Sequence, residues 1–139
     1  MARRDAELLA RVPLFAGLSK RHIRAVAGIS KEQDFPEKAT IAEEGKPGEE
    51  FYVIVEGQAS VVQNGRRVAR LLPGDFFGEI ALLDEGPRTA SVITETPVAV
   101  MSIHRRPFSS LLQKEPTIVL KMLEELAGRL RTQDRSLTG

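Results

Sequence analysis

Turn-forming residues divide residues 30–103 into short segments, and this spacing restricts the fold more than any other feature of the chain. Short β-prone runs lie at 51–55, 59–62, 68–72, 90–94 and 98–103, and glycine or proline follows most of them closely. Asn64–Gly65, between the second and third runs, is the strongest short signal for a β-hairpin. The spacing leaves no room for a helix between successive strands, which excludes a doubly wound α/β fold. We expect a mainly β fold: an antiparallel, jelly-roll-like β-roll of about eight strands.

Helical periodicity precedes and follows the β-rich region. In residues 1–29, Ser19 is suited to cap a helix, because its hydroxyl can accept a hydrogen bond from an N–H of the first turn. In residues 105–135, Pro107 suits the first turn of one helix, and Pro116 ends that helix and begins a second. We expect residues 1–139 to form a single domain in which these helices flank a roll over residues 30–103.

The last predicted helix is amphipathic and contains one weak position. Gly128 lies among good helix formers and costs about 1 kcal/mol relative to alanine. It marks either a hinge or a frayed end. The apolar stripe can pack on the roll or pair with a second copy of the chain, and its spacing does not distinguish the two. Its residues recur at helical intervals: Val119, Met122, Leu123, Leu126 and Leu130.

Residues 77–92 carry the chemistry that we expect of the chain. Gly78 precedes a short helix-prone run, and a glycine there lets a ligand approach the backbone closely. The N–H groups at the start of that run favour an anion. Arg88 follows a turn at Gly86–Pro87 that brings the chain back toward the same anion. Glu79 can accept a hydrogen bond from a sugar hydroxyl, so one phosphate and one ribose would satisfy all three elements.

This segment, FGEIALLDEGPRTASV, resembles the phosphate-binding cassette of the cyclic-nucleotide-binding domain family. The family pattern runs Phe-Gly-Glu, a hydrophobic residue and Ala/Gly-Leu, then a short loop and Arg-Ala/Ser/Thr-Ala. GKPGEEFYVIVEG at 45–57 and VPLF at 12–15 are similar to further parts of the family, so the likeness covers about residues 8–132. The resemblance implies a β-roll with two C-terminal hinge and lid helices that move when a cyclic nucleotide binds.

The resemblance also implies a role for each residue of the cassette. Glu79 would hold the ribose 2′-hydroxyl, and Arg88 would pair with the exocyclic phosphate oxygens. The backbone amides around Ile80 and Ala81 would share the phosphate, and the Thr89 hydroxyl would contact the phosphate or a guanine base. The implied ligand-binding residues are Phe77, Gly78, Glu79, Ile80, Ala81, Arg88, Thr89 and Ala90, and the candidate base contacts are Val61, Leu71 and Arg129.

Several of these residues have ordinary structural interpretations as well. Outside this motif Arg88 would be a solvated turn arginine, and Glu79 would be an acid favoured by a helix N-terminus. Thr89 suits a strand whether or not it meets a ligand. Arg129 fits an ion pair on a solvated helix face better than a ligand contact.

Composition argues against catalysis. The chain has no cysteine and only two histidines, His22 and His104, which lie in different predicted regions. A cupin-type metalloenzyme, which shares the roll architecture, needs a cluster of histidine and carboxylate ligands. No Ser-His-Asp or Cys-His arrangement can be assembled either. We therefore expect a binding module and not an enzyme, with no catalytic residue, no metal and no cofactor besides its ligand.

We expect the ligand to be cAMP, with cGMP as the alternative that Thr89 leaves open. The net charge of +1 argues against a dedicated nucleic-acid binder, and few residues follow Arg131, so we expect no direct nucleic-acid binding. The partner would be an unknown effector. The chain is either a stand-alone sensor or the regulatory domain of a channel, kinase, acyltransferase or transcription factor. Without a signal peptide or a run of about 18 apolar residues, we expect a cytoplasmic protein with no membrane segment.

Overall fold

The Asn64–Gly65 turn adopts the backbone conformation that a tight hairpin needs. Asn64 has φ 53° and Gly65 has φ 78°, and a two-residue hairpin loop of this kind requires positive φ at both positions. Strands β4 (Ala59–Gln63) and β5 (Arg66–Leu71) pair antiparallel on either side of it. The computed structural model describes residues 2–84 and 86–138, and their side chains except those of 2–4, 80 and 133–138.

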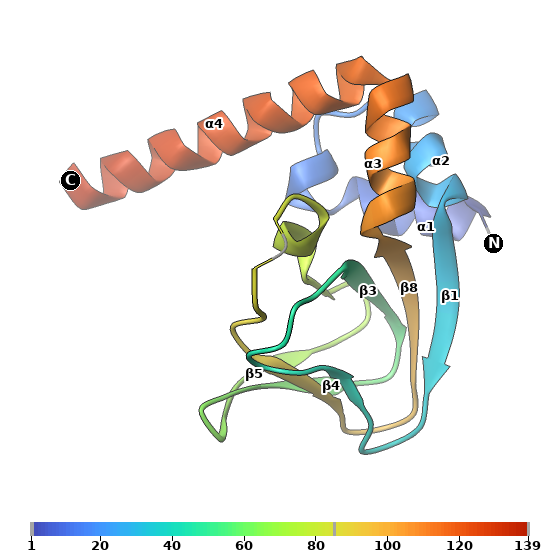
Figure 1. Ribbon diagram of the computed structural model, residues 1–139, viewed down its shortest axis with the longest axis vertical. Coiled ribbons are helices and arrows are strands. Elements are labelled where there is room, and N and C mark those ends of the chain that lie inside the picture. The colour runs from blue at the N-terminus through green and yellow to red at the C-terminus, as the bar shows by residue number, and fades with distance from the viewer. Residues whose placement is uncertain (1, 85, 139) are drawn as a thin grey trace. The chain divides into compact units, whose positions relative to one another are not determined.

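The described residues form two compact units. One is Ile29–Phe108, and the other joins Met1–Gly28 to Ser109–Gly139. The expectation of a single domain over the whole chain stays a prediction. In the first unit the described strands make two antiparallel four-stranded sheets (Figure 1). One sheet has the order β1 (Ser30–Phe35), β8 (Val98–His104), β3 (Glu50–Glu56), β6 (Phe76–Phe77), and the other has the order β2 (Thr40–Ala42), β7 (Ser91–Thr94), β4, β5.

The core of this unit lies between the two sheets. Tyr52, Ile54, Val98 and Val100 form one buried cluster from the first sheet, and a second cluster comes from the other sheet. Three half-buried side chains pack against both clusters, so the sheets face each other through them: Ile41, Leu71 and Phe77. The predicted mainly β, antiparallel roll is therefore confirmed, with eight strands among the described residues.

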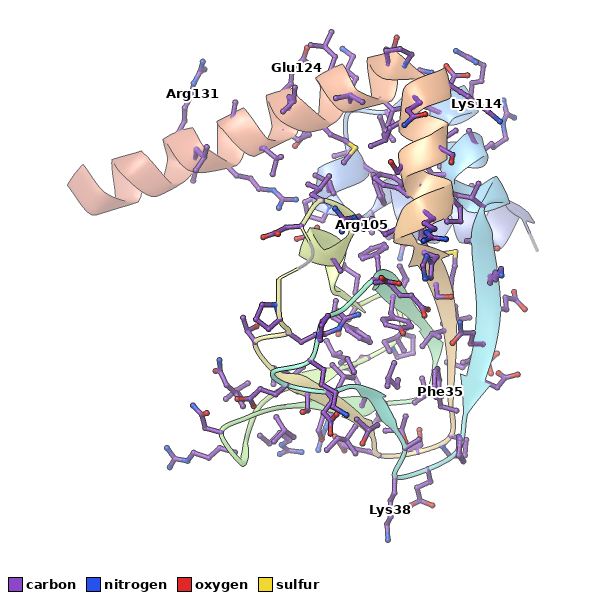
Figure 2. The ribbon with its side chains drawn as sticks, in the orientation of Figure 1. Phe35, Lys38, Arg105, Lys114, Glu124 and Arg131 are labelled. Atoms are coloured by element: carbon purple, nitrogen blue, oxygen red, sulfur yellow. The ribbon has the colours of Figure 1, made fainter. Side chains whose placement is uncertain are left out.

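Three strands of the structure, β1, β2 and β6, were not predicted from the sequence. β1 reads SKEQDF and is largely polar, yet it pairs along its whole length with β8. Gln33 donates to the Ser102 hydroxyl of β8 at 3.0 Å, so a polar side chain is satisfied by the neighbouring strand. Lys38 (φ 62°) lies in the exposed connection from β1 to β2 (Figure 2). Tertiary pairing with β8, rather than local preference, makes the residues of β1 extended.

The described helices of the second unit are α1 (Ala2–Ala10), the 3₁₀ turn η1 (Pro13–Phe15), α2 (Lys20–Gly28), α3 (Arg105–Lys114, shared between the units) and α4 (Pro116–Thr138). Helices α2 and α4 begin where the sequence indicates, and α3 begins two residues earlier than expected. The Ser19 hydroxyl accepts a hydrogen bond from the His22 N–H at 3.2 Å, which is the predicted cap of α2. α3 begins at Arg105 and not at Pro107, and Pro107 still lies in the first turn, where its missing N–H has no partner to lose.

Helix α4 is continuous through Gly128, so neither a break nor a frayed end lies at that residue. Its first turns pack against η1, and Ile118 and Met122 are buried. Farther along, Glu124 and Arg131 are exposed (Figure 2). The predicted stripe is buried only in part, because large apolar side chains of α4 are also exposed: Val119, Leu120, Leu123 and Leu130.

Candidate functional site

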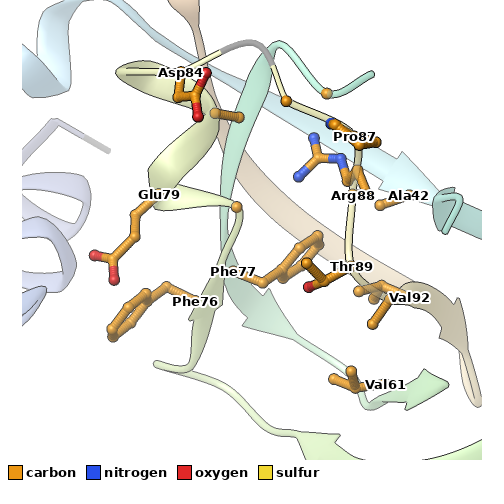
Figure 3. A pocket seen from close by; sticks show the side chains of 15 residues that line it. Ala42, Val61, Phe76, Phe77, Glu79, Asp84, Pro87, Arg88, Thr89 and Val92 are labelled. Atoms are coloured by element: carbon orange, nitrogen blue, oxygen red, sulfur yellow. The ribbon is translucent and has the colours of Figure 1, made fainter. Parts of the chain in front are cut away.

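A cavity of about 560 Å³ opens in the unit Ile29–Phe108. Ligand pockets for small molecules have volumes of about 300–1,000 Å³, so its size suits a nucleotide. The expected binding residues that line it are Phe77, Gly78, Glu79, Ala81, Arg88, Thr89, Ala90 and Val61 (Figure 3). The two distant parts of the cassette therefore meet around one cavity.

Gly78 connects β6 to the 3₁₀ turn η2 (Glu79–Leu82) and has φ 80°. A Cβ atom at this position would come within 2.5 Å of Arg88 Nη1 and 2.9 Å of the Glu50 carbonyl oxygen. Both the backbone conformation and the space therefore require glycine. The Ala81 N–H donates to the Gly78 carbonyl at 3.0 Å, which closes the turn as a single compact element.

The backbone of Arg88 is held by the loop that precedes β3. The Arg88 N–H donates to the Lys46 carbonyl at 2.9 Å, and the Gly45 N–H donates to the Arg88 carbonyl at 2.8 Å. Pro47 and Pro87 form an isolated antiparallel bridge beside these bonds. Backbone hydrogen bonds thus join this loop to the end of the cassette at one edge of the cavity, although the two segments are about forty residues apart in the chain.

The Arg88 side chain lies in an arginine slot, which we define by Gly48, Gly78, the Glu50 carbonyl and the Tyr52 ring. Arg88 Nη2 donates to the Glu50 carbonyl at 2.8 Å. The guanidinium carbon lies 5.8 Å from the centroid of the Tyr52 ring, within the range of a cation–π contact. Gly48 is buried, and a Cβ there would overlap the guanidinium group. The slot therefore holds the cation at the cavity in one place.

Tyr52 remains neutral at physiological pH. Burial and, after it, the nearby Glu50 carboxylate raise the pKa of its phenol to about 12, against the opposing effect of the Arg88 guanidinium. The ring stacks on Phe77 with centroids 4.9 Å apart and planes 24° apart. Arg88 thus faces the aromatic surface of an uncharged ring.

The structure does not bring the Glu79 carboxylate next to the Arg88 guanidinium. Figure 3 shows the two side chains on opposite sides of the backbone that leads from β6 into η2. Both residues line the cavity. The backbone of Ile80 lies in η2, and its side chain is outside the described part of the chain. The expected convergence of Arg88 with the start of η2 is present, and the contact of Glu79 with a ribose stays a prediction.

The three candidate base contacts lie in different parts of the structure. Val61 of β4 lines the cavity beside Val92 and Ala42, which supply an apolar wall. Leu71 packs against the two core clusters instead and is not among the described lining residues. Arg129 belongs to α4 in the other unit, so its contact with a base stays a prediction. The Thr89 hydroxyl is exposed at the cavity.

The profile described as "Cyclic nucleotide-binding domain" matches residues 32–115, which contain the whole cassette. The chain belongs to the cyclic nucleotide-binding domain family.

The proteins to which this chain is similar are named for different regulatory roles. Over 136 residues it is 35% identical to the CRP-like cAMP-activated global transcriptional regulator of Mycobacterium tuberculosis, covering 94% of this chain and 61% of that protein. It is 38% identical over 106 residues to the cAMP-dependent protein kinase regulatory subunit of Aspergillus niger, covering 75% of this chain and 26% of that protein. The crystal structure of the N-terminal domain of a transcriptional regulator from Streptomyces coelicolor matches with a TM-score of 0.84, 29% identity and 93% of each chain. The chain spans less than two thirds of either sequence relative.

Several lining residues of the domain were not predicted. They are Ala42, Gly48, Phe76, Asp84, Gly86, Pro87 and Val92. The Pro47–Gly48 pair is a visible turn signal, but a turn does not reveal that the glycine makes room for an arginine forty residues away. Asp84 lies in the loop of the cassette, and its carboxylate gives the cavity a second acidic group besides Glu79.

The two histidines contact different carboxylates. His22 Nε2 lies 3.4 Å from Glu115 Oε2, and His104 Nε2 lies 3.3 Å from Glu49 Oε2. Within the described residues, no three side chains of the metal-ligating types lie together. No helix in the described part of the chain has the length and apolar content needed to cross a membrane.

Proposed function

We propose that this domain binds cAMP in the cavity beside η2 and acts as a ligand-sensing regulatory module. The observation that carries the proposal is the position of Arg88, whose guanidinium lies in the arginine slot against Gly78 at the start of η2. The two sequence relatives are named for cAMP, which supports the choice of nucleotide. The regulatory role accords with the membership of the family.

The phosphate would lie between the Arg88 guanidinium and the backbone of η2. The Glu50 carbonyl takes one of the five N–H donors of the guanidinium, and a planar guanidinium can donate two parallel bonds to phosphate oxygens. The N–H groups at the start of η2, around Ile80, would face the same anion, and the Ala81 N–H would join them only by leaving the Gly78 carbonyl to which it donates. A cyclic phosphodiester carries one negative charge, which one arginine matches.

The sugar and base would follow from that anchor. Glu79 would rotate toward the cavity and accept a hydrogen bond from the ribose 2′-hydroxyl. The apolar wall of Ala42, Val61 and Val92 would contact the nucleoside. Thr89, exposed at the cavity, would contact the phosphate or, in a complex with cGMP, the base.

Calorimetry with cAMP, cGMP and a cyclic dinucleotide tests the proposal. We expect cAMP to bind with the highest affinity and the cyclic dinucleotide not to bind. If cGMP binds more tightly, the alternative ligand is correct. If none of the three binds, the proposed function is wrong.

Arg88→Ala tests the anchor itself. Truncating one partner of a desolvated charge pair costs about 2–4 kcal/mol, which is roughly a 30-fold to 1,000-fold loss of affinity. Arg66→Ala removes the same charge from the exposed strand β5 and is the matched control, because Arg66 does not line the cavity in the described structure. Equal effects of the two substitutions would show that Arg88 contributes only general charge.

Ligand binding would be transmitted by α3 and α4. Pro116 separates the two helices, so each can change its position without breaking the other. The exposed apolar side chains of α4, such as Leu123 and Leu130, provide a surface that a closed state would cover. A ligand shifts such an equilibrium only by its different affinity for the two states. Equal hydrogen exchange of residues 116–132 with and without saturating cAMP would exclude this movement.

The output of the switch lies in an effector that the module regulates, and the module itself performs no catalysis in this proposal. The mycobacterial relative is named as a transcriptional regulator and the Aspergillus relative as a kinase regulatory subunit. The expectation of no direct nucleic-acid binding has no support from these relatives and stays untested.

A further inference from the structure

A stack of two aromatic rings joins the arginine slot to the cavity wall. Tyr52 of β3 and Phe77 of β6 are directly opposite each other in the antiparallel pair, so their side chains lie on the same face. Their ring centroids are 4.9 Å apart. Phe77 lines the cavity, and the guanidinium carbon of Arg88 lies 5.8 Å from the centroid of Tyr52. Tyr52 therefore touches both the wall of the binding site and its cation.

We propose that Tyr52 is a positioning residue for ligand binding, whose ring holds the Arg88 guanidinium where the cyclic phosphate is to meet it. The inference rests on the proposed function, because it assigns a role to Tyr52 through the phosphate-binding role of Arg88.

The geometry restricts Arg88 on its other sides as well. The backbones of Gly48 and Gly78 lie against the guanidinium so closely that neither position has room for a Cβ. The Glu50 carbonyl fixes one nitrogen at 2.8 Å. An arginine side chain otherwise has a large rotamer entropy, which a defined slot removes before the ligand arrives. The Tyr52 ring is the remaining side of this slot.

The aromatic face, and not the hydroxyl, supplies the contact. A cation is attracted to the face of the ring by its quadrupole, and the attraction is larger where water is excluded. Tyr52 is only 6% exposed. Its pKa of about 12 keeps the phenol neutral, so the hydroxyl itself supplies no negative charge to the guanidinium. Phenylalanine at position 52 should therefore preserve the contact with the Arg88 guanidinium, whereas leucine should remove it.

Calorimetry with cAMP on three variants tests the role. We expect Tyr52→Leu to weaken binding by roughly 3-fold to 30-fold, the range of a buried cation–π contact, and Tyr52→Phe to bind like the parent. Ile54→Ala is the matched control, because Ile54 is fully buried in the same core cluster and does not line the cavity in the described structure. It should lower the melting temperature without lowering the affinity of the folded protein.

The NMR shift of the Arg88 side chain separates positioning from general packing. In the free parent protein, the ring current of Tyr52 should move the side-chain resonances of Arg88 upfield of their values in an unfolded chain. The shift should persist in Tyr52→Phe and Ile54→Ala and disappear in Tyr52→Leu. If Tyr52→Leu does not fold, Tyr52→Ile, which suits a strand better, takes its place.

Three results would overturn the inference. They are an unshifted Arg88 resonance in the parent protein, an affinity of Tyr52→Leu equal to that of the parent, and an equal loss of affinity in Tyr52→Leu and Tyr52→Phe. If the parent protein binds no cyclic nucleotide, the proposed function fails. The upfield NMR shift of the Arg88 resonances would then be the one measurement that shows whether Tyr52 holds that side chain.

Discussion

Gly48→Ala should weaken ligand binding by displacing the Arg88 side chain from its slot. The new Cβ would overlap three atoms of the Arg88 guanidinium, Nε, Cζ and Nη2. The guanidinium is the end of a flexible side chain, so it can turn toward solvent, and this breaks its bond to the Glu50 carbonyl. The backbone of Gly48 itself does not have positive φ, so alanine adds no strain there.

The size of the effect follows from the broken bond. A hydrogen bond to a charged group contributes about 1.5–3 kcal/mol. If Arg88 must return to its slot to bind phosphate, only about 0.6–8% of the molecules are competent at any time, and the apparent affinity falls roughly 13-fold to 160-fold. The loss of stability cannot exceed the same amount, which most domains tolerate at 25 °C because their unfolding free energy is about 5–15 kcal/mol.

Titration calorimetry with cAMP, together with a thermal melt, measures both quantities. Gly86→Ala is the matched control, since Gly86 lines the same cavity and its Cβ would lie 3.6 Å from the nearest atom, an ordinary contact with Asp84. Its affinity should stay within about threefold of the parent, or about 0.65 kcal/mol. A Gly48→Ala protein that binds cAMP as tightly as Gly86→Ala would refute the reasoning about the slot.

Three further predictions concern titration and stability. Tyr52 is the single tyrosine, and its pKa of about 12 against 10.0 for a free phenol predicts little tyrosinate absorbance near pH 10 in the folded protein. Because the pKa of Tyr52 is raised only in the folded state, the free energy of unfolding should fall as pH rises from 10.0 toward 12. Strong tyrosinate absorbance of the native protein at pH 10 would contradict the raised pKa. The Ser60 hydroxyl, donating at 2.6 Å, and then Arg70 hold the pKa of Glu95 below its usual value, so Ser60→Ala should raise that pKa in a carboxyl NMR titration. Gly128→Ala should stabilise α4 by about 1 kcal/mol, since a Cβ there meets no atom within 4 Å, and an unchanged or lower helix content would argue against it.

The parts of the fold that were predictable are those with strong local signals. Asn64–Gly65 indicates its hairpin because few residue pairs accept two positive φ values. The apolar runs that became β3, β4, β7 and β8 are recognisable because buried strands are apolar and rich in β-branched or aromatic residues. β1 was not recognisable, since its polar residues become extended only by pairing with β8.

The candidate site, like the fold, was predictable only where the signal in the sequence is local. The residues of the cassette were predictable because they are close together in the chain and their types and spacing are specific. Leu71 packs against the core, as its apolar character indicates, and its contact with a base stays a prediction, because the direction of a side chain from β5 depends on the facing sheet. The orientation of Glu79 likewise depends on its three-dimensional surroundings (Figure 3).

The sequence by itself determined that an arginine, a glycine turn and an acid would share one short cassette on a β-roll. Only the tertiary structure decided how the arginine is held. The Glu50 carbonyl that receives its hydrogen bond lies 38 residues earlier in the chain, and Gly48 and Tyr52 come from the same distant segment. Antiparallel pairing of β3 with β6, and of the preceding loop with the end of the cassette, brings these groups together. Contacts of this kind depend on which strands become neighbours, and no local spacing in a single sequence records that choice.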